Sequence, residues 1–371
     1  MVVKMNEAFY MQTALQLAAT ALGQTGINPV VGCVIVNSGV VVGLGAHLMR
    51  GEAHAEVNAL RMAEGKTNGA TAYVTLEPCS HYGSTPPCCD ALIQAGVKKV
   101  VIATLDPNPL VAGQGVAKLE AHGIEVSVGV LELEARSLNE KFNYFITSRL
   151  PFVTLKTAST LDGKIATATG DSRWITSSKA REEVHAMRHQ HSAIMVGVNT
   201  IITDDPSLTT RLDVPALHPI RIIADSTLQL PLDAKLLHDK LAPVIILTTT
   251  QANADKRQQL ELLGVEVIDC GDGLQVDLSL AMRLLGEHNI SSILLEGGGT
   301  LNGAMLKAKI VNKIILYVGA KIVGDPNAPS NFNFTGVNLM ADAVSLEQVH
   351  AEMVGEDIKI SGYPIYKEEG G

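Results

Sequence analysis

The sequence has few aromatic residues and no surplus of positive charge. Phe, Trp and Tyr make up 4% of the 371 residues, and the formal net charge is −9 at pH 7. A protein that binds nucleic acid needs a basic face and, for single strands, aromatic side chains on which bases stack. The composition therefore argues against a nucleic-acid partner, but it leaves room for a small basic pocket that binds one phosphate.

Long apolar runs are also missing. No segment approaches the roughly 20 consecutive apolar residues of a membrane helix. Residues 7–23 show the spacing of an amphipathic helix and lack the apolar core of a signal peptide. We therefore expect no membrane partner and a cytoplasmic location.

Strand and helix patterns alternate along the chain, which predicts an α/β fold. Apolar, β-branched runs predict strands at 30–36, 40–44, 70–76, 97–104, 124–128, 152–158, 193–198, 220–224, 244–248, 265–269, 292–296 and 314–318. Helical patterns cover 7–23, 55–63, 88–95, 132–149 and 301–307. Because Leu150-Pro151 opens a new strand, we expect domains at 1–148 and 149–366, with a polar tail at 367–371.

Cysteine is scarce and unevenly placed. Three of the five cysteines fall between Cys79 and Cys89, which favours metal ligands over a disulfide framework. His54 and Glu56 stand at the start of a predicted helix, Cys79 follows a predicted strand, and Cys88 begins the next helix. Catalytic zinc takes three protein ligands and keeps one position open, so His54, Cys79 and Cys88 are the predicted ligands. Glu56 then remains free to shuttle protons. The alternative is a closed structural site with Cys89 as fourth ligand.

The pattern resembles the zinc-dependent nucleobase deaminases, whose signature is H-x-E followed by P-C-x-x-C. Here the longer segment Ser80–Pro87 separates the two cysteines. The stretch TLEPCSHYGSTPPCCDALIQAGV, together with Asn28-Pro29-Val30-Val31-Gly32, resembles the deaminase domain of the bifunctional riboflavin-pathway family. That resemblance implies that Asn28 contacts a pyrimidine. His47 and His81 are candidates for substrate contact or ordinary loop residues.

A glycine-rich turn lies in the second half, where Gly297-Gly298-Gly299 joins a strand to a helix. Backbone N–H groups at such a turn can approach a phosphate, although the pattern is not G-x-G-x-x-G. With LKTASTLDGK at 155–164, GDSRWIT at 170–176 and RIIADS at 221–226, it resembles the reductase domain of the same family. The resemblance implies a fold similar to dihydrofolate reductase and an NADPH cofactor.

The resemblance also implies residue roles. The cofactor would be lined by Ala158, Trp174, Thr200, Asp204, Ser226, Gly298, Gly299, Thr300, Leu301, Asn302, Gly303 and Ala304. The ribotide would contact Ser172, Arg188, Leu208, Arg211 and Glu296. Two of these, Arg188 and Arg211, are suited to grip the sugar phosphate. Lys156, expected at a strand edge, is the candidate proton donor, with Glu296 holding or relaying the proton. Taken alone, Lys156 would be a solvated strand-end lysine, Trp174 a core residue and Arg188 part of a solvated helix face.

The expected fold is therefore a cytidine-deaminase-like three-layer α/β domain followed by a dihydrofolate-reductase-like α/β domain. The expected activity begins with deamination of 2,5-diamino-6-(5-phosphoribosylamino)pyrimidin-4(3H)-one by water that zinc activates. NADPH reduction of the ribosyl group then gives 5-amino-6-(5-phosphoribitylamino)uracil. The alternatives are a nucleic-acid deaminase with an accessory domain and a zinc-stabilised binding protein without catalysis. The sequence leaves a homo-oligomer open.

Overall fold

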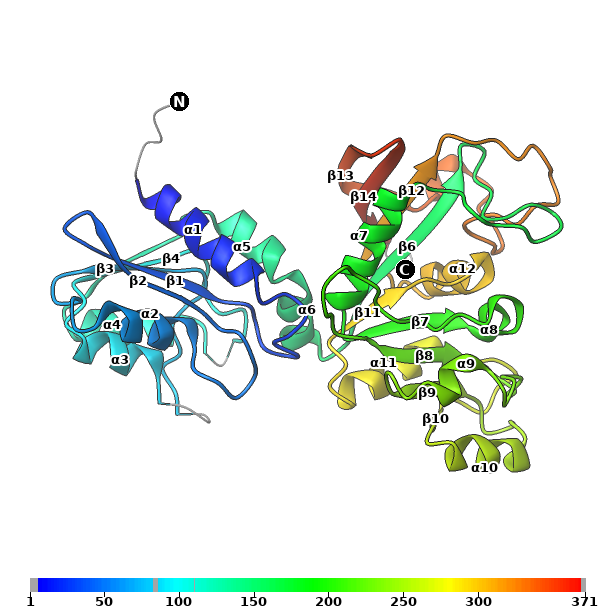
Figure 1. The fold of residues 1–371 in the computed structure, drawn as a ribbon, viewed down its shortest axis with the longest axis horizontal. Coiled ribbons are helices and arrows are strands. Elements are labelled where there is room, and N and C mark those ends of the chain that lie inside the picture. The colour runs from blue at the N-terminus through cyan, green and yellow to red at the C-terminus, as the bar shows by residue number, and fades with distance from the viewer. Residues whose placement is uncertain (1–5, 83–85, 110, 368–371) are drawn as a thin grey trace. The chain divides into compact units, whose positions relative to one another are not determined.

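The computed structural model describes residues 6–82, 86–109 and 111–367, and the chain divides after Arg149 into two compact units (Figure 1). Residues 368–371 of the predicted polar tail lie outside the described residues. Among the helices of the described part, none combines the length and the apolar character needed to cross a membrane.

The first unit is built on a five-stranded mixed sheet with strand order β2-β1-β3-β4-β5. The predicted hairpin is present, since β1 (Gly32–Asn37) pairs antiparallel with β2 (Val40–Ala46). Its two-residue turn places Ser38 at φ 49° and Gly39 at φ 80°, as the twist of a tight hairpin requires. The parallel strands are β3 (Thr71–Val74), β4 (Lys99–Ile102) and β5 (Glu125–Val128).

Helices cover both faces of this sheet, because successive strand residues point to opposite sides. Cys33 and Ile35 pack with α2 (Ala55–Ala63), α3 (Cys88–Gln94) and α4 (Gln114–Ala121). On the other face, Val34 and Val36 pack with α1 (Glu7–Ala19) and α5 (Glu132–Leu138). The result is the three-layer α/β arrangement that the alternating pattern predicts.

The helix predicted at 132–149 is broken into two. Asn139 ends α5 and begins α6 (Glu140–Ser148), with φ −104° and ψ 20°. The helical pattern on both sides is strong, but the Asn139 side chain bonds the backbone of Val30, a tertiary contact that the local sequence does not reveal.

The second unit is built on a nine-stranded sheet with order β10-β9-β8-β7-β11-β6-β12-β14-β13. The strands from β10 to β12 in that order run parallel, and β14 and β13 add an antiparallel hairpin. The sequence patterns do not predict this hairpin. The strands are β6 (Phe152–Thr160), β7 (Ala193–Gly197), β8 (Ile220–Ala224), β9 (Val244–Thr248), β10 (Glu266–Asp269), β11 (Ser292–Leu295), β12 (Lys313–Gly319), β13 (Ser345–Val354) and β14 (Asp357–Ile365).

Helices cover the faces of the parallel part. On one face of the sheet, the main core is formed by side chains of β6, β7 and β11 that pack against helices. On the other face, side chains of β7, β8 and β9 form a second core cluster. The helices are α7 (Ser178–His189), α8 (Val198–Asp204), α9 (Lys235–His238), α10 (Ala254–Leu262), α11 (Leu278–Glu287) and α12 (Gly299–Lys307), with a 3-10 turn at Met340–Asp342.

The expected placement of Lys156 at a strand edge is wrong. Its strand, β6, pairs with β11 on one side and β12 on the other, so Lys156 lies in the middle of the sheet. A run such as LKTAST cannot reveal the position of a strand in its sheet, because that position depends on long-range pairing.

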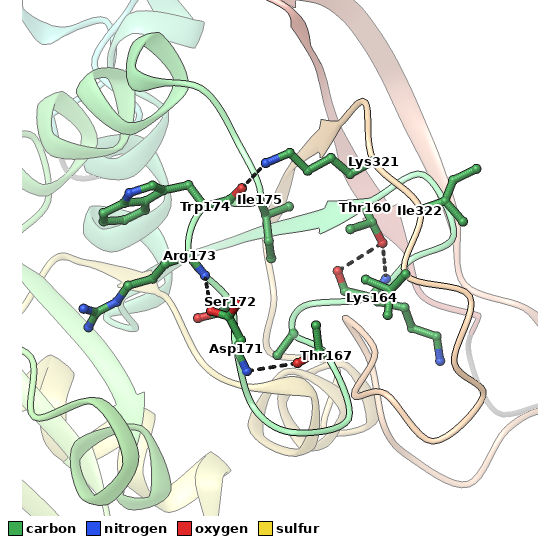
Figure 2. A pocket seen from close by; sticks show the side chains of 12 residues that line it. Thr160, Lys164, Thr167, Asp171, Ser172, Arg173, Trp174, Ile175, Lys321 and Ile322 are labelled. Atoms are coloured by element: carbon green, nitrogen blue, oxygen red, sulfur yellow. Dashed lines mark hydrogen bonds between the residues drawn. The ribbon is translucent and has the colours of Figure 1, made fainter.

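Loops that follow β6 and β12 enclose a small cavity of about 210 Å³ (Figure 2). Ser172 and Trp174 line it from one loop and Lys321 from the other, and the Lys321 amine donates to the Trp174 carbonyl. Trp174 is 59% exposed, which excludes the ordinary core role. The Arg181 guanidinium stacks over its ring at 4.2 Å from the centroid.

Candidate active sites

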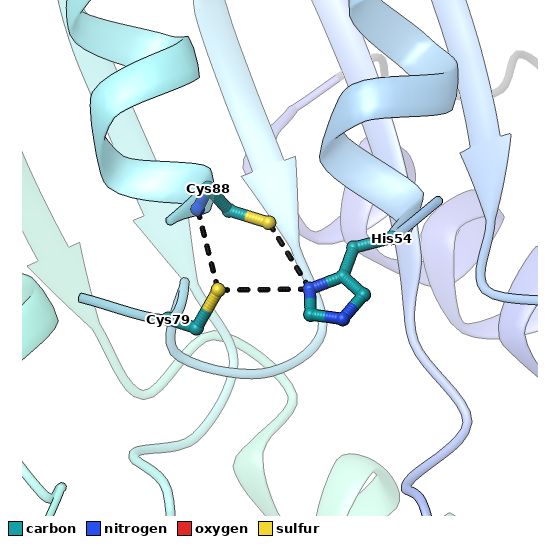
Figure 3. A group of neighbouring side chains, drawn as sticks. All are labelled: His54, Cys79 and Cys88. Atoms are coloured by element: carbon teal, nitrogen blue, oxygen red, sulfur yellow. Dashed lines mark hydrogen bonds between the residues drawn. The ribbon is translucent and has the colours of Figure 1, made fainter. Parts of the chain in front are cut away.

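Three side chains that are far apart in the sequence form one compact cluster in the first unit (Figure 3). His54 precedes α2, Cys79 lies in the loop after β3, and Cys88 is the first residue of α3. Their potential ligand atoms all lie within 4.8 Å of one another. The Nδ1 atom of His54 is 3.2 Å from Cys88 Sγ and 3.6 Å from Cys79 Sγ.

The electrostatics of the cluster favour a thiolate. The backbone N–H of Cys88 donates to Cys79 Sγ at 3.2 Å. The side-chain hydrogen bond from Cys88, followed by that from His54, lowers the pKa of Cys79 to about 4. In the same pair, the hydrogen bond to Cys79 and then burial raise the pKa of Cys88. Cys79 is therefore the more acidic of the two thiols, and the thiolate is the form that binds a metal ion.

This donor set fits zinc. One imidazole nitrogen and two sulfurs make a three-ligand set that leaves a fourth position for water or substrate. Cys89 does not complete a closed site, since its thiol points to the carbonyl oxygens of Pro78 and Gly115. The structural-zinc alternative therefore lacks its fourth ligand among these cysteines.

Glu56 lies beside the cluster on the first turn of α2 and is 3% exposed. Burial, and then the negative charge of Cys79, raise the pKa of Glu56 to about 7. A carboxyl group with a pKa near neutrality can both accept and release a proton, which is what an acid–base catalyst must do.

A cavity of about 270 Å³ joins these residues to the predicted pyrimidine contact. The Asn28 amide faces the His47 ring, with Nδ2 and Nε2 3.3 Å apart. The lining consists of Asn28, Pro29, Val31, His47, His54, Glu56, Leu76, Glu77, Cys79, His81, Asp106 and Phe142. The structure thus brings Asn28 and Glu56 to one concave site with the predicted zinc ligands.

Two lining residues were missed by the sequence reasoning. Glu77 accepts backbone hydrogen bonds that secure the loop beyond β4, from the N–H groups of Asp106, Gly113, Gly115 and Val116. The available signal was an acidic residue at the end of an apolar strand, directly before Pro78-Cys79. Phe142 reaches the cavity from α6, and nothing in the local sequence indicates that contact.

The second unit has a larger cavity, of about 500 Å³, at the carboxyl ends of β7, β8 and β11. Ligands in open parallel sheets bind at such a position. The first N–H groups of α12 have no intrahelical acceptor, and the N-cap residue, Gly298, has no side chain that could accept from them. A Cβ at Gly298 would meet no atom within 4 Å, so this turn is open to a phosphate.

The predicted cofactor residues divide into two groups. The cavity is lined by Thr200, Ser226, Gly298, Gly299, Thr300, Leu301 and Ala304. The lining of this cavity does not include Ala158, Trp174, Asp204, Asn302 or Gly303.

Two residues of the run Gly298–Ala304 do not line this cavity, because a helix presents only some of its residues to one side. Asn302 is fully buried and donates from Nδ2 to the Asn331 carbonyl at 3.0 Å. A Cβ at Gly303 would lie 2.5 Å from the Asn333 carbonyl oxygen. Both residues therefore pack α12 against the 331–333 segment.

Arg188, Glu296 and Lys156 form a charged cluster in the second unit. The Arg188 guanidinium pairs bidentately with Glu296 and donates from Nη1 to the Thr209 carbonyl at 2.9 Å. The pair is mostly buried, so Arg188 is not on a solvated helix face. Burial, partly offset by the charge of Glu296, lowers the pKa of Lys156. Burial would raise the pKa of Glu296, but the charge and hydrogen bonds of Arg188 hold it below its ordinary value.

The remaining predicted ribotide contacts differ in their exposure. Leu208 is 4% exposed and its side chain packs in a core cluster, so that side chain does not face an open site. Arg211 is exposed, and its backbone N–H donates to His185 Nδ1 at 3.2 Å. Ser172 lines the smaller cavity of Figure 2 with Trp174. His185, His189 and His191 do not form a metal site in the described part of the chain.

Comparison with known families identifies both units. Residues 4–104 match the cytidine and deoxycytidylate deaminase zinc-binding region, and residues 151–360 match the RibD C-terminal domain. The fold and the metal cluster thus define a bifunctional enzyme in which a zinc deaminase precedes a reductase of dihydrofolate-reductase-like fold, a class that implies NADPH. The chain belongs to the RibD family of riboflavin biosynthesis proteins.

Relatives match almost the whole chain. It is 43% identical over 364 residues to riboflavin biosynthesis protein RibD of Bacillus amyloliquefaciens, covering 98% of each chain. It is 42% identical to the RibD of Escherichia coli K12, covering 95% of this chain and 98% of that one. The structure of Acinetobacter baumannii RibD is 39% identical with a TM-score of 0.87, covering 97% of this chain and 99% of that one.

One solved structure carries a fuller title. A diaminohydroxyphosphoribosylaminopyrimidine deaminase/5-amino-6-(5-phosphoribosylamino)uracil reductase from Thermotoga maritima is 37% identical, with a TM-score of 0.84, and covers 97% of this chain and 99% of that one. The family membership makes this chain an enzyme, which sets aside the binding protein without catalysis.

Proposed function

We propose that residues 1–148 deaminate 2,5-diamino-6-(5-phosphoribosylamino)pyrimidin-4(3H)-one and that residues 149–366 reduce the product with NADPH. The final product is 5-amino-6-(5-phosphoribitylamino)uracil. The observation that carries the proposal is a single cavity lined by Asn28, Glu56 and two of the three predicted zinc ligands, His54 and Cys79. The third ligand, Cys88, lies next to those two.

In the deamination, water replaces the amino group and ammonia leaves. Zinc, when bound by His54, Cys79 and Cys88, supplies a Lewis acid that lowers the pKa of water. Glu56 takes a proton from the attacking water and returns protons to the ring nitrogen and the leaving amine. Asn28 orients the pyrimidine through its amide, and that amide is in contact with the His47 ring.

In the reduction, a hydride adds to C1 of the ribosyl group and a proton is delivered as its ring opens. NADPH supplies the hydride, and the open glycine turn at Gly298 is suited to hold one of its phosphates. Lys156 delivers the proton, and the carboxylate of Glu296 sets its charge state. Arg211 contacts the sugar phosphate, whereas Arg188 serves first to hold Glu296.

The test is a mass-spectrometric product assay on purified, zinc-loaded protein given the diaminopyrimidinone ribotide. Deaminated product without NADPH, and a further gain of two hydrogens with NADPH, would support both halves of the proposal. Deamination alone would contradict the assignment of residues 149–366. No product from protein that contains zinc would contradict the substrate itself.

The proposal includes a cytoplasmic location and leaves a homo-oligomer to experiment. All five cysteines are free, which suits a reducing compartment. Light scattering of the purified chain tests the oligomeric state.

A further inference from the structure

Asn139 makes an unusual use of its side chain. It is the N-cap residue of α6, where asparagine normally accepts a hydrogen bond from the first turn of the helix. No such cap bond is present, and Asn139 is 4% exposed. Its amide is turned away from its own helix, toward a segment more than a hundred residues earlier in the chain.

The amide binds both backbone polar groups of one residue, Val30. The Val30 N–H donates to Asn139 Oδ1 at 2.9 Å, and Asn139 Nδ2 donates to the Val30 carbonyl oxygen at 2.9 Å. A residue on a neighbouring strand would make the same two bonds to Val30. Asn139 makes them at a position that no strand among the described residues pairs with. The ladder between β1 and β2 begins only at Gly32.

Val30 lies two residues beyond Asn28, which faces the cavity. Asn28 lines the deaminase cavity, and Pro29 between them has no N–H with which to secure its own backbone. Thr25 holds the other end, since its Oγ1 donates to the Asn28 carbonyl oxygen at 2.9 Å. The short segment 28–30 is therefore fixed by Thr25 before it and by Asn139 after it.

The same turn of helix also forms a wall of the cavity. Phe142 lies three residues beyond Asn139, which is one helical turn, and its ring lines the cavity with Asn28. With the helix interrupted at Asn139, the Asn139 amide bonds to Val30, and α6 runs in a direction that places Phe142 at the cavity.

We propose that Asn139 is a positioning residue of the deaminase, which acts on the substrate through Asn28. This inference rests on the proposed function, in which Asn28 contacts the pyrimidine. Loss of the amide pair would let segment 28–30 move, so that the Asn28 amide no longer meets the ring in a single geometry. A displacement of about 1 Å is enough to cost a large factor in rate.

The test is a double-mutant cycle on deamination. In the wild-type background, Asn139→Leu should lower kcat/KM by about tenfold or more, mainly through kcat, because a misoriented ring spends less time in the reactive geometry. In the Asn28→Ala background, the same change should alter kcat/KM by less than about twofold, since the residue through which it acts is gone. Additive losses in the two backgrounds would overturn the proposal.

Two internal controls separate positioning from unfolding. Zinc content and reductase activity on the deaminated ribotide should both stay at wild-type levels in Asn139→Leu. Asn143→Leu, the same substitution one turn along α6, should leave deamination unchanged. Loss of zinc together with deamination in both Asn139→Leu and the smaller, uncharged Asn139→Ser would overturn the proposal, because Asn139 would then be needed only for packing.

The Asn28→Ala variant by itself tests the proposed function. If Asn28→Ala deaminates at the wild-type rate, the assignment of Asn28 as a substrate contact fails, and the positioning role fails with it. If Asn28→Ala is impaired while Asn139→Leu is unaffected, only the positioning role is refuted.

Discussion

The guanidinium of Arg188 holds the carboxylate of Glu296 with two parallel hydrogen bonds, of 2.7 Å from Nε and 3.0 Å from Nη2. Arg188 comes from α7, and Glu296 follows directly on β11. The pair holds the carboxylate near Lys156, so the pKa values of Glu296 and Lys156 both depend on the position of this carboxylate.

Removal of Arg188 should therefore damage both stability and reduction. Arg188→Met leaves the Glu296 carboxylate buried with less compensation, which should cost about 3 kcal/mol in the free energy of unfolding of the second unit. Reductase activity should fall while deamination is kept. Denaturant titration and NADPH oxidation measure the two effects.

The matched control is Lys235→Met. Lys235 pairs with Asp205 in the same unit, but both side chains are well exposed, so its loss should leave stability almost unchanged. Equal effects of the two substitutions would show that the Arg188–Glu296 pair carries no special weight.

The zinc site can be tested on two adjacent cysteines. Cys88→Ser should lower the zinc retained after dialysis and abolish deamination, because Cys88 Sγ is one of three clustered ligand atoms. Cys89→Ser should keep its zinc, since the Cys89 thiol bonds to carbonyl oxygens instead. Metal analysis gives the answer, and zinc loss in Cys89→Ser would revive the closed structural site.

The role of Glu56 can be separated from metal binding. Glu56→Gln keeps the size of the side chain but removes its proton transfer, so kcat for deamination should fall by about 10²–10⁴-fold. Zinc content should be unchanged, because the metal cluster consists of His54, Cys79 and Cys88. Ammonia release measures the step, and the wild-type rate in this variant would rule Glu56 out as the proton shuttle.

The second unit should lose stability as pH falls. Burial, and then the charges of Arg188 and Arg211, lower the pKa of His185 from 6.5 to about 4. A histidine with a lowered pKa binds fewer protons in the folded than in the unfolded state within that window. Above about pH 6.5 His185 is neutral in both states and does not reduce the free energy of unfolding. As pH falls from 6.5 toward 4, only the unfolded state takes up the proton, so the free energy of unfolding decreases.

The His185→Gln variant isolates this effect. Between pH 6.5 and 4 its melting temperature should fall less steeply than that of the wild-type protein, as thermal unfolding at several pH values can show. His288→Gln is the control, since His288 is partly exposed and the pKa of that residue is raised. Parallel curves for His185→Gln and the wild-type protein would contradict the prediction.

Local patterns were sufficient for much of the fold. The β1–β2 hairpin follows from two apolar runs around a short polar turn, and the alternation of strands and helices follows from periodicity. The hairpin of β13 and β14 was missed because most of β13 is exposed on both faces, which leaves no clean alternation to detect.

The sequence by itself determined the chemistry of the metal site. His54, Cys79 and Cys88 are the residue types that bind zinc, they stand at element ends, and Glu56 is two positions from the histidine. Residue type and spacing are local properties, and they suffice because element ends in an α/β sheet gather on one side.

Only the tertiary structure decided which distant residues contact one another and which of them face a cavity. It paired Arg188 with Glu296, put Lys156 inside the sheet, and turned Asn302 and Gly303 away from the large cavity. It also broke a helix at Asn139 so that one amide could bind Val30. Such contacts join residues from about 30 to more than 100 positions apart, and their geometry depends on packing that no local pattern encodes.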